Sequence, residues 1–226
     1  MNTEKNYTMW LWAFVGVVLL GAVAAMIKLS YTASLTPNPA VQTVDIASSI
    51  VASDFVRNNP TASTTLVEYG DYQCPACGAY HSALKQIEKE LGGKFRFIFR
   101  DSPLQQHPNA RLAAQAAHAA GNQGKFWEMH DMIYETQRDW SEKNKTEAVA
   151  IFTSFAAKLK LDADKFSKDL FNNAIIDKIE ASFDQGVGFG VDSTPTFFLN
   201  NVKLSPQSFA DFRDAIANAA NATSTR

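Results

Sequence analysis

The sequence is poor in cysteine, because Cys74 and Cys77 are the only two among its 226 residues. A small fold held together by disulfides needs more cysteines at wider spacings, so this class of protein is excluded. A structural zinc site normally needs four cysteine or histidine ligands in matched pairs. The four histidines show none of the usual zinc-ligand spacings: His81, His107, His118 and His130. We therefore predict no metal site.

The sequence also lacks an excess of charge of either sign. It has 21 Lys and Arg against 23 Asp and Glu, for a net charge of −2. A nucleic-acid-binding domain normally presents a basic surface, so we predict no nucleic-acid partner. Hydrophobic residues make up 46% of the chain, enough for a sizeable core. Without an N-terminal segment, roughly 160–190 residues remain, which suits one domain with an inserted subdomain.

A third absence is local, since no charged residue occurs between Asn6 and Ile27. This run reaches the roughly 20 apolar residues that a helix needs to cross a bilayer. We predict an N-terminal transmembrane helix and assign residues 1–29 to a membrane anchor. A signal peptide is the alternative, but its apolar region would normally be only about 7–15 residues long. Lys5 and Lys28 flank the run on either side and leave its orientation undetermined.

Residues 30–63 follow the predicted anchor and are rich in Ser, Thr, Ala, Asn and Pro, with few charges. This composition is typical of a linker, and we predict a stalk that connects the anchor to the globular part. A short helix near residues 46–56 is the one regular element that the stalk sequence suggests.

The globular part begins with a β-α-β pattern. Residues 64–69 are β-branched and apolar, as in a buried strand. Residues 77–91 have helical composition and end at two glycines, and residues 94–100 alternate charged and apolar side chains. Because parallel strands need a crossover connection, this order predicts a parallel pair joined by a helix.

A long helical stretch comes next, and the chain then returns to strands. Between Arg111 and Val187, apolar side chains recur at helical spacing in several segments. Residues 196–204 then read as a hairpin with a turn at two asparagines, and a last helix is predicted to begin at Ser205-Pro206. The chain is therefore an α/β protein with a helical block between its strands.

Cys74 and Cys77 lie where the chain passes from the first predicted strand into a helix. The first N–H groups of a helix carry partial positive charge and stabilise a thiolate, and Pro75 has no N–H to lose there. The spacing places both sulfurs near one another on the first turn. A bridge across so short a loop constrains the unfolded chain little, so the pair indicates redox chemistry rather than a structural staple. His81, one turn further on, is expected to be half-exposed.

Two further features stay open when only the residues are considered. Glu68 lies in the apolar strand before Cys74. It is either an ordinary edge carboxylate or a buried acid that exchanges protons with Cys77. Pro195, which follows Thr194, is an ordinary residue at the start of a strand, and a cis peptide bond there is uncommon.

Four separated motifs resemble those of DsbA-like thiol–disulfide oxidoreductases, which have a thioredoxin fold. They are Leu66-Val67-Glu68-Tyr69-Gly70-Asp71-Tyr72-Gln73-Cys74-Pro75-Ala76-Cys77, His107-Pro108-Asn109-Ala110, Gly124-Lys125-Phe126-Trp127-Glu128-Met129-His130 and Val191-Asp192-Ser193-Thr194-Pro195-Thr196-Phe197-Phe198. The likeness covers roughly residues 54–217. It implies a thioredoxin-like domain over residues 64–102 and 191–220, interrupted by a helical subdomain over residues 103–190.

The resemblance also implies a role for each candidate residue. Cys74 would be the exposed nucleophile, and Cys77 would resolve the mixed disulfide. Glu68 would be the buried proton-relay carboxylate. Thr194 and a cis Pro195 would line the groove that binds substrate backbone. The redox group would be the Cys74–Cys77 disulfide itself, with no other cofactor.

The dipeptide between the cysteines, Pro75-Ala76, departs from the Pro-His of the strongest oxidants, so the oxidising power is not fixed. The resemblance implies an extracytoplasmic dithiol oxidase that introduces disulfides into exported proteins with free thiols. A membrane quinone-linked partner would reoxidise it. The chain would be a single-pass protein of a bacterial-type cell membrane with its catalytic domain in the periplasm. A reductase or isomerase using the same residues, or a tethered peptide-binding or chaperone module, is the alternative.

Overall fold

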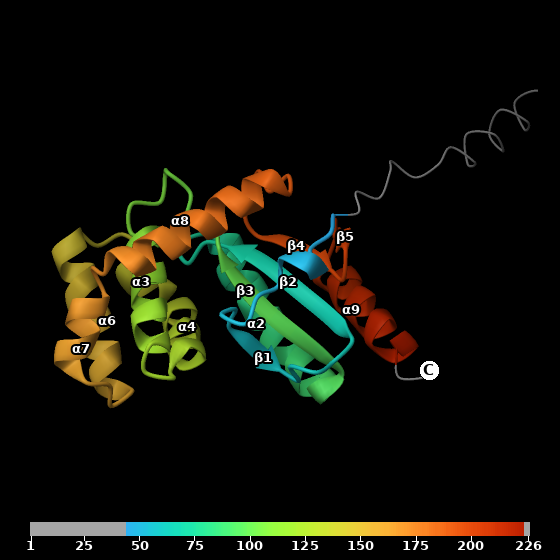
Figure 1. Ribbon diagram of the computed structural model, residues 1–226, viewed down its shortest axis with the longest axis horizontal. Helices are drawn as coiled ribbons and strands as arrows, with labels where there is room; N and C mark the ends of the chain where they lie inside the picture. Colours follow the sequence, from blue (N-terminus) through green and yellow to red (C-terminus); the bar gives the residue numbers. More distant parts are fainter. Residues whose placement is uncertain (1–43, 224–226) are drawn as a thin grey trace, which may run out of the picture. The chain divides into compact units, whose positions relative to one another are not determined.

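The computed structural model describes residues 44–223. Within them, five strands form one sheet: β1 Val56–Asn58, β2 Thr64–Gly70, β3 Phe95–Asp101, β4 Thr196–Leu199 and β5 Val202–Lys203. Their order across the sheet is β1-β3-β2-β4-β5 (Figure 1). β2 and β3 run parallel, whereas β1 pairs antiparallel with β3, β4 with β2 and β5 with β4. The predicted parallel pair and the predicted hairpin are confirmed.

Helices cover the sheet and extend beyond one end of it. They are η1 Ala47–Ser49, α2 Pro75–Leu91, η2 Gly92–Lys94, α3 Ala110–Gly121, α4 Phe126–Glu135, α5 Gln137–Trp140, α6 Lys145–Lys158, α7 Ala163–Asp169, α8 Asn173–Gly188 and α9 Phe209–Thr223. The helices α3 to α8 all lie between β3 and β4 in the chain and form a helical insertion. In Figure 1, α3, α4, α6 and α7 gather beyond one end of the sheet, and α8 runs from this group back along the sheet.

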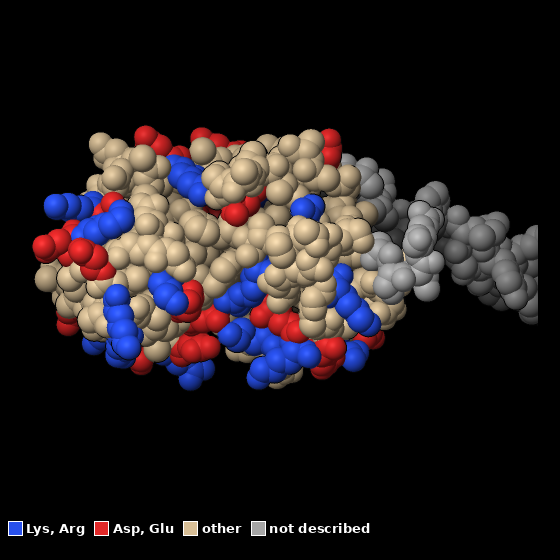
Figure 2. Space-filling model, turned by 60° about the horizontal axis from the view of Figure 1, so that its bottom comes forward, with Lys and Arg blue, Asp and Glu red and all other residues tan. Residues whose placement is uncertain are grey.

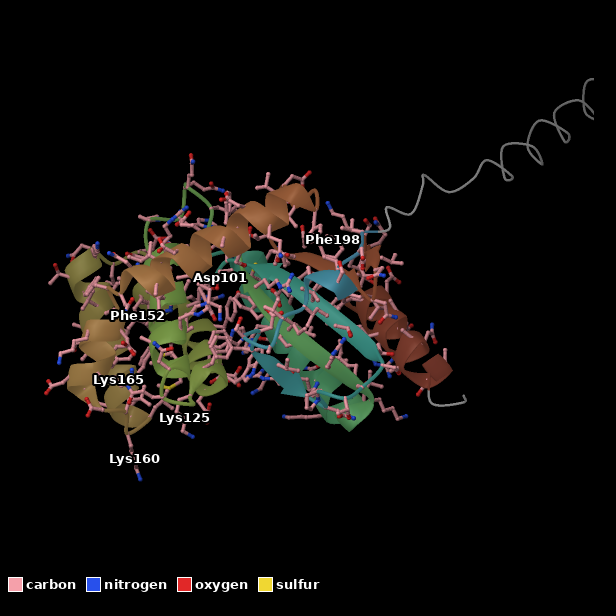
Figure 3. All side chains as sticks on the ribbon, in the orientation of Figure 1. Asp101, Lys125, Phe152, Lys160, Lys165 and Phe198 are labelled. Atoms are coloured by element: carbon pink, nitrogen blue, oxygen red, sulfur yellow. The ribbon has the colours of Figure 1, made fainter. Side chains whose placement is uncertain are left out.

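β2 is buried along its whole length, and its side chains alternate between two cores. Leu66 belongs to the larger core, which includes α2 and Phe152 of the insertion. Tyr69 belongs to a smaller core with Phe198. Figure 3 labels Phe152 in the helical block and Phe198 at the sheet. By the same alternation Glu68 shares the face of Leu66, so its carboxyl group lies on the side of the sheet that α2 covers.

The prediction of a stalk over residues 30–63 is wrong for the part that the structure describes. Ile46 is 0% exposed in the smaller core, and β1 pairs with β3. The ring of Phe55 stacks on that of Phe126 in α4, with centroids 3.8 Å apart. The composition is misleading because this segment has few apolar residues, and several of them, including Ile46 and Phe55, pack against residues distant in the sequence.

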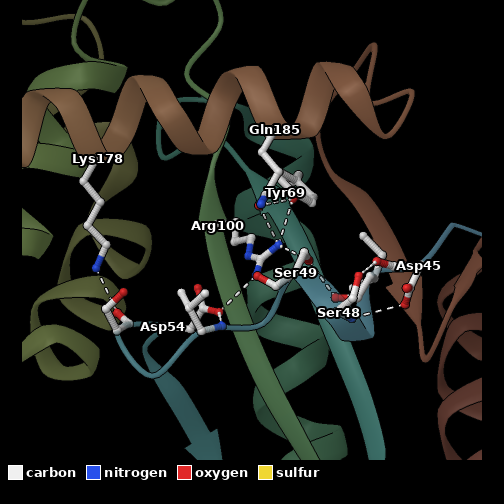
Figure 4. Close-up of polar contacts among 11 residues, drawn as sticks. Asp45, Ser48, Ser49, Asp54, Tyr69, Arg100, Lys178 and Gln185 are labelled. Atoms are coloured by element: carbon white, nitrogen blue, oxygen red, sulfur yellow. Dashed lines mark hydrogen bonds and ion pairs between the residues drawn. The ribbon is translucent and has the colours of Figure 1, made fainter.

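Arg100 connects the segment around Ser49 and Asp54 to the sheet (Figure 4). Its guanidinium donates to side-chain oxygens of Ser49, Tyr69 and Gln185 at 2.8, 3.0 and 2.7 Å. It also donates to the Ser49 carbonyl at 2.7 Å and to the carboxylate of Asp54 at 3.0 Å. A buried cation is costly unless it is paired and its donors are satisfied, and Arg100 is 5% exposed. These bonds therefore hold the residues around η1 against β2 and α8.

We expect Ile46→Val to lower the free energy of unfolding by about 1 kcal/mol, because it removes a buried methyl group and leaves a small cavity. Val51 lies in the same segment but is 56% exposed, so Val51→Ala should change stability by less than about 0.5 kcal/mol. Urea unfolding of the two variants measures both effects. Equal losses would contradict the assignment of Ile46 to the core.

The last helix begins later than predicted. α9 starts at Phe209 rather than at Ser205-Pro206. The hydroxyl of Ser208 accepts the N–H of Asp211 at 3.1 Å, as in a helix cap. The segment offers two serines as possible caps, and the sequence pattern does not distinguish between them.

The predicted membrane anchor, residues 1–29, and the first part of the predicted stalk lie outside the described residues. Between residues 44 and 223, no helix is both long enough and apolar enough to cross a bilayer. On the face of the molecule shown in Figure 2, basic and acidic side chains are interspersed along the lower edge. Neither sign of charge forms an extended field on that face.

Candidate active site

Cys74 is the N-cap residue of α2 and directly precedes its first residue, Pro75. Its backbone is extended (φ −70°, ψ 121°), and Pro75 occupies the first helical turn. The carbonyl of Cys74 accepts the N–H of Gly78 at 3.2 Å, which is the first hydrogen bond of the helix. The predicted position of Cys74 at a helix start, directly after a buried strand, is confirmed. Its sulfur therefore lies at the positive end of α2.

The two cysteines have unequal surroundings, and both are free thiols in the structure. Cys74 is 7% exposed, whereas Cys77 is 0% exposed. The sulfur of Cys77 accepts the backbone N–H of Asp71 at 3.5 Å. Solvent and a protein substrate can therefore approach Cys74 but not Cys77.

The surroundings also separate the acidities of the two thiols. The pKa of Cys74 is lowered to about 5, chiefly by a hydrogen bond from the Cys77 thiol, and further by the N–H groups of Cys77 and Ala76 and by Thr194. Burial raises the pKa of Cys77 well above its ordinary value, and the hydrogen bond to Cys74 and the charge of Glu68 add to the effect. At neutral pH Cys74 is a thiolate and Cys77 keeps its proton.

Glu68 is a buried acid on the cysteine side of the sheet. It is 2% exposed, and its Oε1 has no hydrogen-bond partner. Burial, and secondly the charge of Cys74, raise its pKa to about 8. A Cβ on Gly70 would collide with the ring of Phe99 and lie 3.0 Å from Glu68 Oε1, so glycine leaves the room that this carboxyl occupies. Its burial excludes the ordinary edge carboxylate, and the exchange of protons with Cys77 stays a prediction.

Thr194 and Pro195 lie opposite the end of β2, because the antiparallel pairing of β4 with β2 places Thr196 beside Tyr69. The peptide bond between Thr194 and Pro195 is cis. The sulfur of Cys74 lies 3.4 Å from the carbonyl oxygen of Thr194, to which it can donate a hydrogen bond only when it is protonated. Pro75 and Ala76 form the start of α2 between the two cysteines. The predicted site residues therefore lie together in the structure.

The prediction that His81 is half-exposed is wrong. It is 5% exposed and stacks on the ring of Tyr134 at 5.1 Å, and burial lowers its pKa to about 4. Together with His130 and Asp131 it places possible metal-ligand atoms within 4.8 Å of one another. The carboxylate of Asp131 is already paired with the ammonium group of Lys85 at 2.6 Å and with the guanidinium of Arg57. A helix register alone could not show that α4 packs over this face of α2.

A family model described as "Thioredoxin" matches residues 52–218. The chain belongs to the thioredoxin family. Its fold is that of DsbA proteins, as the resemblance implied. The crystal structure of α-DsbA1 from Wolbachia pipientis matches with a TM-score of 0.67 at 22% identity, covering 76% of this chain and 93% of that one. Oxidised BdbD from Bacillus subtilis matches with a TM-score of 0.64 at 23% identity, covering 74% and 92%.

Curated relatives that match this thioredoxin-family chain are named Na⁺/H⁺ antiporters, and the matches are partial. NhaA 1 of Salinispora arenicola is 37% identical over 148 residues, which cover 65% of this chain and 22% of the antiporter. NhaA of Herminiimonas arsenicoxydans is 32% identical over 151 residues, which cover 67% and 23%. The chain thus spans less than a quarter of these relatives, and most of their length has no counterpart in the match.

Asp71 is a residue of the site that the sequence patterns did not single out. It is 1% exposed, and its carboxylate accepts the N–H groups of Gln73 and Leu104 at 2.7 and 2.8 Å. It also bonds the Nδ1 atom of His107 at 2.7 Å. These bonds fix the loop between β2 and α2, and the Asp71 N–H in turn contacts Cys77. An aspartate just after a strand is typical of such turns, but its partners come from a distant loop.

Proposed function

We propose that this protein is an extracytoplasmic thiol–disulfide oxidoreductase that acts as a dithiol oxidase on exported proteins. The observation that carries the proposal is the contrast between Cys74 and Cys77. One sulfur is accessible with a pKa of about 5, and the other is buried with a raised pKa. A stabilised thiolate favours the reduced form of the pair, which makes the corresponding disulfide an oxidant.

The reaction begins from the Cys74–Cys77 disulfide. A substrate thiolate attacks Cys74 Sγ, the substrate–Cys74 bond forms, the bond to Cys77 breaks, and the electron pair stays on Cys77 Sγ. The second substrate thiolate then attacks the substrate sulfur of the mixed disulfide, and Cys74 leaves as a thiolate. Two electrons have passed from the two substrate thiols to the cysteine pair, and the substrate carries a new disulfide.

The neighbouring residues have matching roles in this proposal. Glu68 holds a proton at neutral pH and can give it to the leaving sulfur of Cys77, whose own pKa is high. Thr194 lies beside Cys74, and together with Pro195 it would bind the backbone of the substrate next to the reacting sulfur. No further cofactor takes part in the exchange.

The proposal includes a route for reoxidation. The reduced pair would pass its electrons to a membrane quinone-linked partner, and residues 1–29 would anchor the chain in a bacterial-type cell membrane as a single-pass protein. Anchoring raises the effective concentration of the catalytic domain near such a partner. The support for this part is the uncharged run from Asn6 to Ile27 and the DsbA fold.

Measuring the reduction potential of the Cys74–Cys77 pair in glutathione buffers tests the direction of the reaction. We expect a value closer to the roughly −120 mV of DsbA than to the roughly −270 mV of thioredoxin, because the Cys74 thiolate is stabilised. A value near that of thioredoxin would favour the reductase alternative. A tethered chaperone with an idle cysteine pair would keep full activity in cells after Cys74→Ser.

The same thiolate makes a prediction about stability. Because the pKa of Cys74 is lowered in the folded state, its thiolate stabilises the reduced fold. The contribution is complete above pH 9.0, the ordinary pKa of the thiol, and it is lost as the pH falls through about 5. We therefore expect the free energy of unfolding at pH 7 to be about 1–2 kcal/mol larger for the reduced protein than for the oxidised one. This figure allows for solvent screening of the partly accessible sulfur. Urea unfolding of both forms at pH 5, 7 and 9 measures the difference. A difference that does not vary with pH contradicts the prediction.

A further inference from the structure

Gln137, the first residue of α5 in the helical insertion, reaches the active-site loop of the thioredoxin domain. Its side-chain nitrogen donates to the backbone carbonyls of Tyr72 and Cys74, each at 2.8 Å. These two carbonyls stand on either side of Gln73. One amide group of the insertion therefore holds the backbone just before and at the reactive cysteine.

The carbonyl of Cys74 is the one polar group of its peptide bond, because Pro75 has no N–H. The orientation of this peptide unit can therefore be fixed by hydrogen bonds only through the carbonyl oxygen. Two donors meet that oxygen, the N–H of Gly78 from within α2 and the amide of Gln137 from the insertion. The same peptide unit sets where the Cys74 sulfur lies relative to the N–H groups of Ala76 and Cys77, which bond it.

Gly78 provides the room for this contact. A Cβ at this position would lie 3.0 Å from Oε1 of Gln137 and 3.4 Å from its Nε2. An alanine would therefore crowd the amide, which would have to shift by a few tenths of an ångström and so strain its bonds to the two carbonyls. The glycine directly after Cys77 and the glutamine in the insertion thus fit one another, although they are far apart in the sequence.

A second pair of bonds connects the same two parts. The side chain of Gln73 donates to the carbonyl of Ser141 at 2.8 Å and accepts the N–H of Asn109 at 2.7 Å. The insertion therefore contacts the loop through both its backbone and its side chains. Of these contacts, the one from Gln137 acts on the peptide unit of the reactive cysteine itself.

We propose that Gln137 is a positioning residue for Cys74, by which the helical insertion holds the Cys74 carbonyl so that the first N–H groups of α2 face its sulfur. The inference deepens the proposed thiol–disulfide exchange and rests on it. Gln137 does not touch the reacting atoms. It acts through the backbone, so removing its amide makes Cys74 less acidic and less reactive at low pH without removing any group that bonds the sulfur directly.

The test measures the pH dependence of Cys74 reactivity toward a small alkylating agent in the full chain. We expect Gln137→Met, which keeps the volume but removes the donor, to raise the pKa of Cys74 by about one unit, a roughly tenfold loss of thiolate at acid pH. Gln137→Glu, which replaces the donor by an acceptor, should raise it further. Arg138→Ala, at the adjacent exposed position of α5, is the matched control and should leave the profile unchanged.

Gly78→Ala supplies a second, independent variant. With Gln137 present, it should also raise the pKa of Cys74, because its methyl group crowds the amide and strains the hydrogen bonds to the two carbonyls. In the Gln137→Met background it should have little further effect, so the two changes are not additive. Additive shifts would contradict the proposed coupling.

An unchanged pH profile in Gln137→Met, with only a lower thermal stability, would overturn the proposal and leave Gln137 as a structural contact. This outcome is distinct from a failure of the proposed function. If the proposed function fails, the wild-type protein has a low Cys74 pKa but does not oxidise a reduced substrate protein. The effect of Gln137→Met on the pKa of Cys74 can still be measured in that protein.

Discussion

Cys74→Ser is expected to abolish thiol–disulfide exchange, with a loss of activity of at least about a thousandfold. A serine hydroxyl neither ionises in this pH range nor forms a disulfide, so the step on which the reaction depends is removed. The assay is the oxidation of a reduced substrate protein by the oxidised enzyme, followed through the loss of free thiols. Ser82→Ala, on an exposed part of the same helix, is the control and should keep full activity.

Cys77→Ala should give a different result from Cys74→Ser. The accessible sulfur of Cys74 remains, although its pKa rises when the Cys77 thiol no longer donates to it, and the buried sulfur that would attack a mixed disulfide on Cys74 is gone. We expect the Cys74 thiolate to attack a disulfide of an oxidised substrate protein, so that one substrate sulfur leaves and a mixed disulfide on Cys74 accumulates. A reducing agent should break this complex. If Cys77→Ser and Cys77→Ala trap nothing while Cys74→Ser keeps its activity in cells, the exchange mechanism is wrong.

Glu68→Gln is expected to stabilise the reduced protein and to slow the exchange. The pKa of Glu68 is raised from 4.5 to about 8, so folding forces the carboxyl to keep a proton that the unfolded chain releases. Such a group costs no stability below about pH 4.5, and its cost grows until the pH reaches about 8. At pH 7 the variant should be more stable by about 1–3 kcal/mol, since part of the gain is offset by burying an amide.

The rate effect of Glu68→Gln has a separate cause. An amide cannot donate a proton to the Cys77 sulfur as the disulfide opens, so we expect exchange at pH 7 to slow by roughly 10- to 100-fold. Stopped-flow measurement with a thiol peptide gives the rate, and urea unfolding from pH 4 to 9 gives the stability. Glu90→Gln, which alters an exposed ion pair at the end of α2, should change neither appreciably. A stability difference between wild type and Glu68→Gln that stays constant over this range contradicts the raised pKa.

Much of the thioredoxin-like architecture could be predicted because its elements are strongly patterned. The apolar run of β2 and the alternation in β3 are local properties of the chain, and so are the two glycines that end α2. The cysteine spacing likewise fixed which sulfurs could meet. The motifs at Glu68, Cys74 and Pro195 then assigned the candidate site through resemblance.

Other elements escaped prediction because their reasons lie in distant contacts. β1 is three residues long, and its partner is β3. Ile46 is buried by residues from both ends of the domain. The guanidinium of Arg100 pairs with Asp54, which lies in a segment whose composition resembles that of a linker. His81 is buried by α4, which the helix pattern of α2 cannot reveal.

The sequence by itself determined the chemistry of this protein, since two cysteines three positions apart at a helix start can form a reversible disulfide. Only the tertiary structure decided how that chemistry is tuned. It buried Cys77 and left Cys74 accessible, it placed Glu68 in an apolar setting, and it brought Gln137 to the Cys74 carbonyl. The reason is that pKa values depend on burial and on hydrogen bonds between groups far apart in the chain, and such contacts exist only after folding.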